Sequence, residues 1–131
     1  NCQMDSPNLD RVIRIKTSTC RGGIIENVFV RDITVDQCRE AVLRINLQYE
    51  NRENCNRNFP PVVRNVHLKN VTCEKSRLGV LIIGLDDDQH VYNISVEDSH
   101  FNNVAKGTND IKGAKDVTLK NLYINGKLVK E

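Results

Sequence analysis

The sequence lacks several features of membrane proteins, nucleic-acid binders and disordered chains. It contains no run of about 18 apolar residues, so we expect no membrane partner. Its formal net charge is only +2, which is too small for attachment to nucleic acid by bulk electrostatics, so we expect no nucleic-acid partner. No sustained low-complexity tract is present, and 39% of the residues are hydrophobic. The sequence therefore predicts one globular domain over residues 1–131.

The cysteines exclude a common kind of metal site. None forms a Cys-x-x-Cys pair or lies at zinc-finger spacing from a histidine, so we expect no metal and no cofactor. Their number, five, is odd, which leaves at least one thiol without an internal partner. We interpret these side chains as small hydrophobic filler. They are Cys2, Cys20, Cys38, Cys55 and Cys73.

A repeated pattern is the main positive signal. In each copy an Asn or Asp precedes apolar residues at relative positions 0, 2, 5 and 7, and two polar residues interrupt the alternation. Apolar alternation with a period of two predicts strands with one buried face, and the interruption predicts a bend between two short strands. Only Ser99 departs from the apolar rule. The copies span 27–35, 65–73, 93–101 and 116–124.

Each bend is predicted at an Asn or Asp, because these side chains tolerate the left-handed backbone of a tight bend. Two segments, beginning at Asn70 and Asn93, also match the glycosylation acceptor pattern. Both asparagines fall at recurrent bend positions, so we interpret them as structural turns. The bend residues are Asp32, Asn70, Asp98 and Asn121.

A third strand is predicted for each early copy, at 12–17, 41–47 and 79–85. Three short strands for each coil, stacked coil on coil, predict an all-β parallel β-helix of about four to five coils. A leucine-rich repeat would need a different leucine pattern. Segment 48–61 has no apolar period and is predicted to be an inserted loop, whereas Asn125-Gly126 predicts a hairpin turn.

A cluster of cations is predicted on the third strands. Arg14 and Lys16 share the outward face of their strand, and Arg44 and Asn46 are expected at the stacked positions of the next coil. The coil after that is expected to supply Ile82 and Gly84 there, which ends the basic stripe. Such a cluster suits a carboxylate ligand, although a solvated polar face is the alternative interpretation.

The same region resembles glycoside hydrolase family 28, the polygalacturonases. The resemblance begins with Arg14-Ile15-Lys16 inside segment 6–17 and includes Arg21-Gly22-Gly23 and Glu26-Asn27-Val28. It extends to the C-terminus through Ile45-Asn46-Leu47-Gln48-Tyr49 and Pro60-Pro61-Val62. It implies a right-handed, single-stranded parallel β-helix that hydrolyses pectic galacturonan with inversion and without a metal. A secreted or periplasmic location is expected because that substrate is extracellular.

The resemblance also implies roles for individual residues. Arg14 and Lys16 would bind a galacturonate carboxylate beside the cleavage point, with Tyr49 lining the same subsite. The expected stacking of the strands, rather than the resemblance, adds Arg44 as a third cation. The family's N-T-D, D-D and G-H-G motifs precede the R-I-K region, and none precedes Arg14 here. We therefore expect no catalytic residue in this chain, which we interpret as a C-terminal fragment truncated at its N-terminus.

Other polar motifs are interpreted as structural. The acidic run 86–88 follows a third strand and is expected to be a solvated turn, and 8–10 is expected to be a turn rather than a variant of N-T-D. The histidines at 67, 90 and 100 are expected at outward or loop positions.

Two alternatives to the hydrolase fragment remain open. The first is a non-catalytic β-helix module in which Arg14, Lys16 and Arg44 hold an anionic glycan for binding or adhesion. The second is a structural solenoid that self-associates through its N-terminal coil, residues 1–17, because unpaired strand edges favour pairing with another chain.

Overall fold

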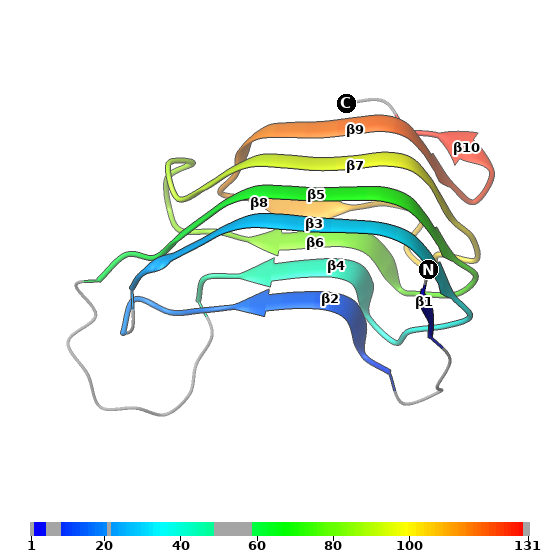
Figure 1. Cartoon of the computed structure of the whole chain (residues 1–131), viewed down its shortest axis with the longest axis horizontal. Helices are drawn as coiled ribbons and strands as arrows, with labels where there is room; N and C mark the ends of the chain where they lie inside the picture. The colour runs from blue at the N-terminus through cyan, green and yellow to red at the C-terminus, as the bar shows by residue number, and fades with distance from the viewer. Residues whose placement is uncertain (1, 5–8, 21, 49–58, 130–131) are drawn as a thin grey trace.

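Every regular element of the computed structural model is a β-strand (Figure 1). The structure describes residues 2–4, 9–20, 22–48 and 59–129. Six strands form one sheet in the order β1-β3-β5-β7-β9-β10, and four form another in the order β2-β4-β6-β8. All neighbouring strands are parallel except β9 and β10, so the all-β class with parallel sheets is confirmed. The described ranges contain no helix long and apolar enough to cross a membrane. The strands are β1 (Cys2–Met4), β2 (Arg11–Lys16), β3 (Ile24–Val35), β4 (Ala41–Asn46), β5 (Val62–Cys73), β6 (Leu78–Ile83), β7 (Val91–Phe101), β8 (Asp110–Lys112), β9 (Lys115–Ile124) and β10 (Lys127–Leu128).

The chain alternates between the two sheets, and its strand register follows the sequence repeat. In Figure 1 the chain passes through β2, β4 and β6 in one direction and returns through the long strands β3, β5 and β7. Val28 pairs with Val66, Val66 with Ile94, and Ile94 with Val117. Equivalent residues of the four copies are therefore stacked on neighbouring strands, although the loops between the copies differ in length.

Each predicted pair of short strands is one long strand that bends at its Asn or Asp. A left-handed backbone at the bend lets the strand turn while its apolar residues on both sides of the bend still point inward. All four predicted bend residues are left-handed, which confirms that prediction. Their φ angles are 58° at Asp32, 56° at Asn70, 51° at Asp98 and 54° at Asn121.

Side-chain amides connect the bends of successive strands. Asn70 Nδ2 donates to Asp32 Oδ1 at 2.8 Å, and Asn93 Nδ2 donates to Asn65 Oδ1 at 2.6 Å. Asn65 and Asn93 also have left-handed backbones, each with a φ of 56°. The interpretation of Asn70 and Asn93 as structural turns is therefore confirmed.

The hydrophobic core lies between the two sheets. Leu43 and Ile45 from β4 and Leu68, Ile94 and Phe101 from the long strands are almost fully buried in one cluster. Burying side chains of this size contributes about 1.5–3 kcal/mol each relative to exposure. This packing makes the sheets a rigid support for the side chains on their outer faces.

The predicted third strands are confirmed to within two residues, but β8 was not predicted. Its three residues contain only one apolar side chain, Ile111, which is too short a signal for period-two alternation. The hairpin at Asn125-Gly126 is confirmed, because Lys127 pairs antiparallel with Ile124. Of the predicted loop 48–61, residues 49–58 lie outside the described residues.

The cysteines do not all have one role. Cys38 and Cys73 are free thiols buried in the core, as predicted for hydrophobic filler. Contact with Cys73, together with burial, raises the pKa of Cys38, so its thiol stays protonated at neutral pH. The filler prediction is wrong for Cys20, which forms a disulfide, and for Cys2, which is exposed.

Candidate functional site

The outer face of the four-stranded sheet carries the predicted cations. Arg14 and Lys16 are both exposed on the edge strand β2. The register pairs Arg14 with Arg44 and Lys16 with Asn46, as the sequence predicts. Neighbouring strands lie about 4.8 Å apart, so these side chains leave the sheet within reach of one ligand.

The residues predicted at the end of the basic stripe are wrong by one position along β6. Arg44 pairs with Leu81 and Asn46 pairs with Ile83, rather than with Ile82 and Gly84. The run from Leu78 to Ile83 is apolar on both faces, so alternation in the sequence cannot tell which residues point outward. The conclusion that β6 supplies no cation still holds, and the outer face changes from basic on β2 to apolar on β6.

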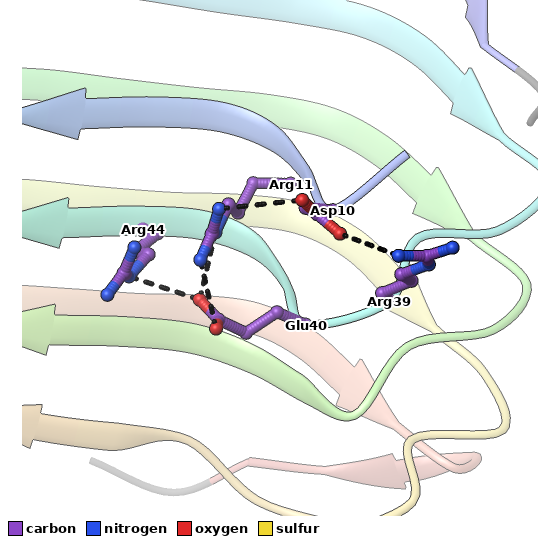
Figure 2. Close-up of polar contacts among 5 residues, drawn as sticks. All are labelled: Asp10, Arg11, Arg39, Glu40 and Arg44. Atoms are coloured by element: carbon purple, nitrogen blue, oxygen red, sulfur yellow. Dashed lines mark hydrogen bonds and ion pairs between the residues drawn. The ribbon is translucent and has the colours of Figure 1, made fainter. Parts of the chain in front are cut away.

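Arg44 is held in place by a carboxylate that sequence reasoning missed. Glu40, immediately before β4, accepts hydrogen bonds from Arg11 Nε at 3.0 Å and Arg11 Nη2 at 3.1 Å. Arg44 Nε lies 3.1 Å from Glu40 Oε1, and Figure 2 shows both guanidinium groups converging on this carboxylate. The Arg44 side chain is only 15% exposed. Arg44 is therefore a fixed cation whose charge is partly neutralised by Glu40.

The environment of Glu40 favours its ionised form. Partial burial by itself raises the pKa of the Glu40 carboxyl, but the hydrogen bonds from Arg11 and the charges of Arg44, Arg11 and Arg77 outweigh it. The net effect is a pKa below the ordinary value for glutamate. The network extends to Asp10, which lies 3.8 Å from Arg11 and 3.7 Å from Arg39 (Figure 2). No signal in the sequence identifies the pair of Glu40 and Arg44, because residues four apart along a strand are about 13 Å apart and only the turn before β4 brings Glu40 to Arg44.

Asn46 has a structural role at the end of β4. It is only 7% exposed, and its Oδ1 accepts a hydrogen bond from the backbone amide of Gln48 at 2.8 Å. Gln48 Nε2 in turn donates to the carbonyl oxygen of Gly84 at 2.5 Å. These bonds tie the segment after β4 to the segment after β6.

A hollow of about 400 Å³ lies where β2, β4 and β6 end. It begins next to Lys16 and Asn46, because the segments that follow these strands line it. The sequence did not predict this hollow, since loop residues carry no periodic signal. Its lining residues are Ser18, Thr19, Leu47, Gln48, Leu85, Asp86 and Asp87.

The acidic run 86–88 is an exposed turn, as predicted. Asp87 Oδ1 accepts a hydrogen bond from the amide of Gln89 at 2.8 Å, and Asp88 Oδ1 accepts one from Gln89 Nε2 at 2.6 Å. The structure adds that Asp86 and Asp87 face the hollow beside the cation cluster. Their negative charge lies next to the positive charge of the Arg14 and Lys16 region.

The remaining predicted residues lie elsewhere. Tyr49 is outside the described residues, so its role stays a prediction. His67 and His100 point outward from the long strands and stack on Phe29 and Tyr123, whereas His90 lies in a turn, which confirms the expected placement. Within the described ranges, no three His, Cys, Asp or Glu side chains form a group that could hold a metal ion.

A comparison of the chain with protein-family models, curated proteins and solved structures finds no match. The function is therefore inferred from the site itself.

Proposed function

We propose that this chain forms the C-terminal coils of a right-handed, single-stranded parallel β-helix of about four to five coils. Three observations support this architecture. The long strands stack with a register equal to the sequence repeat, and the third strands form their own parallel sheet facing them. A hydrophobic core lies between the two sheets, as expected for the interior of a solenoid.

The proposed function is to bind the carboxylates of pectic galacturonan within an inverting glycoside hydrolase resembling family 28. The observation that carries it is the register of β2 on β4, which places the exposed Arg14 and Lys16 next to the largely buried Arg44, on a sheet whose ends border a hollow. The planar guanidinium group of Arg14 would form two parallel hydrogen bonds with a uronate carboxylate, and Lys16 would add a second positive charge. Arg44 lies on the neighbouring strand, where its ion pair with Glu40 holds it in place.

Cleavage by this mechanism needs two further carboxyl groups. One protonates the leaving oxygen and the other activates water, at a separation of roughly 6.5–9.5 Å. We expect them on coils that precede Arg14, in a secreted or periplasmic parent protein. The 131-residue chain by itself is therefore expected to bind galacturonan without hydrolysing it.

Calorimetric titration with trigalacturonate tests the binding role. Replacing both Arg14 and Lys16 with alanine should weaken binding by at least about tenfold, because hydrogen bonds to charged groups contribute about 1.5–3 kcal/mol. Arg44→Ala should weaken it less, since Glu40 already neutralises much of that charge. Lys127→Ala, which removes an exposed cation on β10, is the matched control. Unchanged affinity in the double variant would contradict the proposal.

Hydrolysis is tested separately on longer chains. A protein that includes the preceding coils, with an acidic cluster stacked next to Arg14, should release reducing ends from polygalacturonate, whereas the 131-residue chain should release none. An inactive longer protein that still binds trigalacturonate would favour the non-catalytic glycan-binding module.

The edge formed by β2 and β3 favours a second candidate, self-association. In the described residues β1 covers only Ile33–Val35 of β3, so no described strand pairs with Ile24–Asp32 of β3 on that side. Val28 and Val30 there are only partly buried, unlike their partners Val66 and Leu68. Light scattering over a range of concentrations tests this, and a strictly monomeric chain at high concentration would exclude it.

A further inference from the structure

A groove crosses the outer face of the six-stranded sheet, on the sheet that does not carry Arg14 and Lys16. Two rows of side chains form its walls across β3, β5 and β7. One row is Phe29, His67 and Ser95, and the other is Arg31, Lys69 and Glu97, as the strand register requires. Val30 and Leu68 lie between the rows, and the hollow measures about 520 Å³.

One wall is an ordered aromatic platform. Phe29 is 72% exposed, and its ring stacks on His67 with centroids 5.4 Å apart and planes inclined by 24°. His67 Nδ1 is hydrogen-bonded to Ser95 Oγ at 2.6 Å, which fixes the orientation of the imidazole. His67, which is itself fixed by Ser95, therefore holds the Phe29 ring at the surface in a defined orientation.

The other wall is mainly cationic. The Arg31 side chain is 83% exposed, and Asp32 lies 3.9 Å from it, a distance at which an exposed pair contributes little. Lys69 is also exposed, and the row continues beyond Glu97 to Lys120 on β9. The groove lining therefore presents two cations and one carboxylate next to the aromatic platform.

This combination matches the chemistry of an acidic sugar. An aromatic face packs against the apolar C–H face of a sugar ring, and a guanidinium group forms paired hydrogen bonds with a carboxylate. We propose that this groove is a second binding site for a uronic-acid oligosaccharide, with Phe29 as the stacking platform and Arg31 and Lys69 as the carboxylate clamp. The choice of galacturonate as the probe rests on the proposed function, but the residues are different.

A single-stranded nucleic acid also binds through stacking and cations. Two features of the protein argue against a nucleic-acid ligand in this groove. Glu97 lies in the cationic wall and would repel a phosphate backbone, and the net charge of +2 gives little of the electrostatic attraction on which such binding depends. Glu97 repels a sugar carboxylate as well as a phosphate, but the exposed ring of Phe29 fits one sugar ring rather than a series of stacked bases, which favours the sugar.

The experiment is a nuclear magnetic resonance titration of the isotopically labelled 131-residue chain with trigalacturonate. We expect the amide signals of Phe29, His67 and Lys69 to shift on addition of the trimer. Phe29→Ala should weaken this response at least tenfold while the signals around Arg14 and Lys16 still respond. Ile24→Ala, which truncates another exposed apolar side chain of β3, should leave both responses unchanged.

Two further probes test the ligand class. The fully methyl-esterified trimer has the same rings without the charges, and we expect it to bind the groove at least tenfold more weakly. A short single-stranded oligodeoxythymidine should not shift the groove signals at the same concentration. Equal binding of the ester, or tighter binding of the oligonucleotide, would overturn the proposal.

The titration tests the second site and the proposed function separately. Shifts at Arg14 and Lys16 without shifts in the groove would overturn the second site and leave the proposed function standing. Shifts in the groove alone, abolished by Phe29→Ala, would support the second site and contradict the proposed function. Because Phe29 is exposed, its variant should unfold at the wild-type temperature, so a lost response reports binding rather than folding.

Discussion

The hydroxyl of Ser99 accepts a hydrogen bond from the backbone amide of Val71 at 3.1 Å, in a position where Ser99 is completely buried. The hydroxyl also donates to the carbonyl oxygen of Glu97 at 2.8 Å. Ser99 is the one residue that departs from the apolar pattern of the repeat, and these bonds explain why. At this point of the bend the sheet ladder between β5 and β7 is interrupted, and the side chain replaces it.

Ser99→Val restores the apolar repeat but should destabilise the protein. The buried Val71 amide would lose its partner, at a cost of about 1–3 kcal/mol. Chemical unfolding measures the change. Ser95→Ala, which removes a hydroxyl bonded to His67 near the surface, should have a smaller effect. A variant as stable as the wild type would mean that the hydrogen bond contributes nothing.

The bend residues should tolerate glycine better than alanine. Asn70→Ala should cost about 1–2 kcal/mol, because alanine is strained in the left-handed region and the bond to Asp32 is lost. Asn70→Gly loses the same bond without that strain and should be the more stable of the two variants. Thermal unfolding of the pair measures the difference, and the reverse order would show that the backbone angle is not what selects Asn here.

Gly84 should not accept any side chain. An added Cβ would collide with the backbone carbonyl oxygen of Gly113, and backbone atoms cannot move aside as a flexible side chain can. Gly84→Ala should therefore destabilise the protein by several kcal/mol or disrupt the pairing of β6 with β8. Gly23→Ala is the control, because a Cβ there meets nothing within 4 Å and costs only about 1 kcal/mol of backbone strain. Equal losses in the two variants would contradict the steric argument.

The Glu40 network predicts a loss of stability in acid. Because the pKa of Glu40 is lowered in the folded state, its ion pairs contribute fully above the ordinary pKa of glutamate. The contribution is lost as the pH falls through the lowered value. Glu40→Gln should therefore be less stable than the wild type at neutral pH, and the difference should shrink in acid.

Urea unfolding at a series of pH values measures this change. The control is Asp88→Asn, which neutralises an exposed carboxylate outside the network, and it should follow the wild-type profile. If the difference in free energy of unfolding between wild type and Glu40→Gln stays constant with pH, ionisation of Glu40 does not contribute to stability.

The stacking of the copies and the bends could be predicted from the sequence because both depend on local chemistry. Apolar residues at period two must face a core, so equivalent residues of successive copies align, as Val28 and Val66 do. Asn and Asp recur where the backbone must be left-handed, as at Asp32 and Asn70. The stacking of Arg14 on Arg44 follows from the same alternation.

The errors lie where the local pattern is ambiguous. The strand Leu78–Ile83 is apolar on both faces, so the sequence could not tell that Leu81 rather than Ile82 pairs with Arg44. Strand β8 was missed because three residues carry too little periodicity. The filler prediction fails at Cys20, which forms a disulfide, because sequence spacing does not reveal which thiols meet.

The sequence by itself determined the all-β class, the spacing of the copies, the bend positions and the outward Arg14 and Lys16 of β2, since each follows from alternation or from the conformational range of one residue type. Only the tertiary structure decided what surrounds those cations and what the other sheet displays. The turn before β4 brings Glu40 to Arg11, and the pairing of β3 with β5 puts Phe29 on His67. Such contacts join residues about 30 to 40 positions apart, and loop lengths and strand register set them rather than any local pattern.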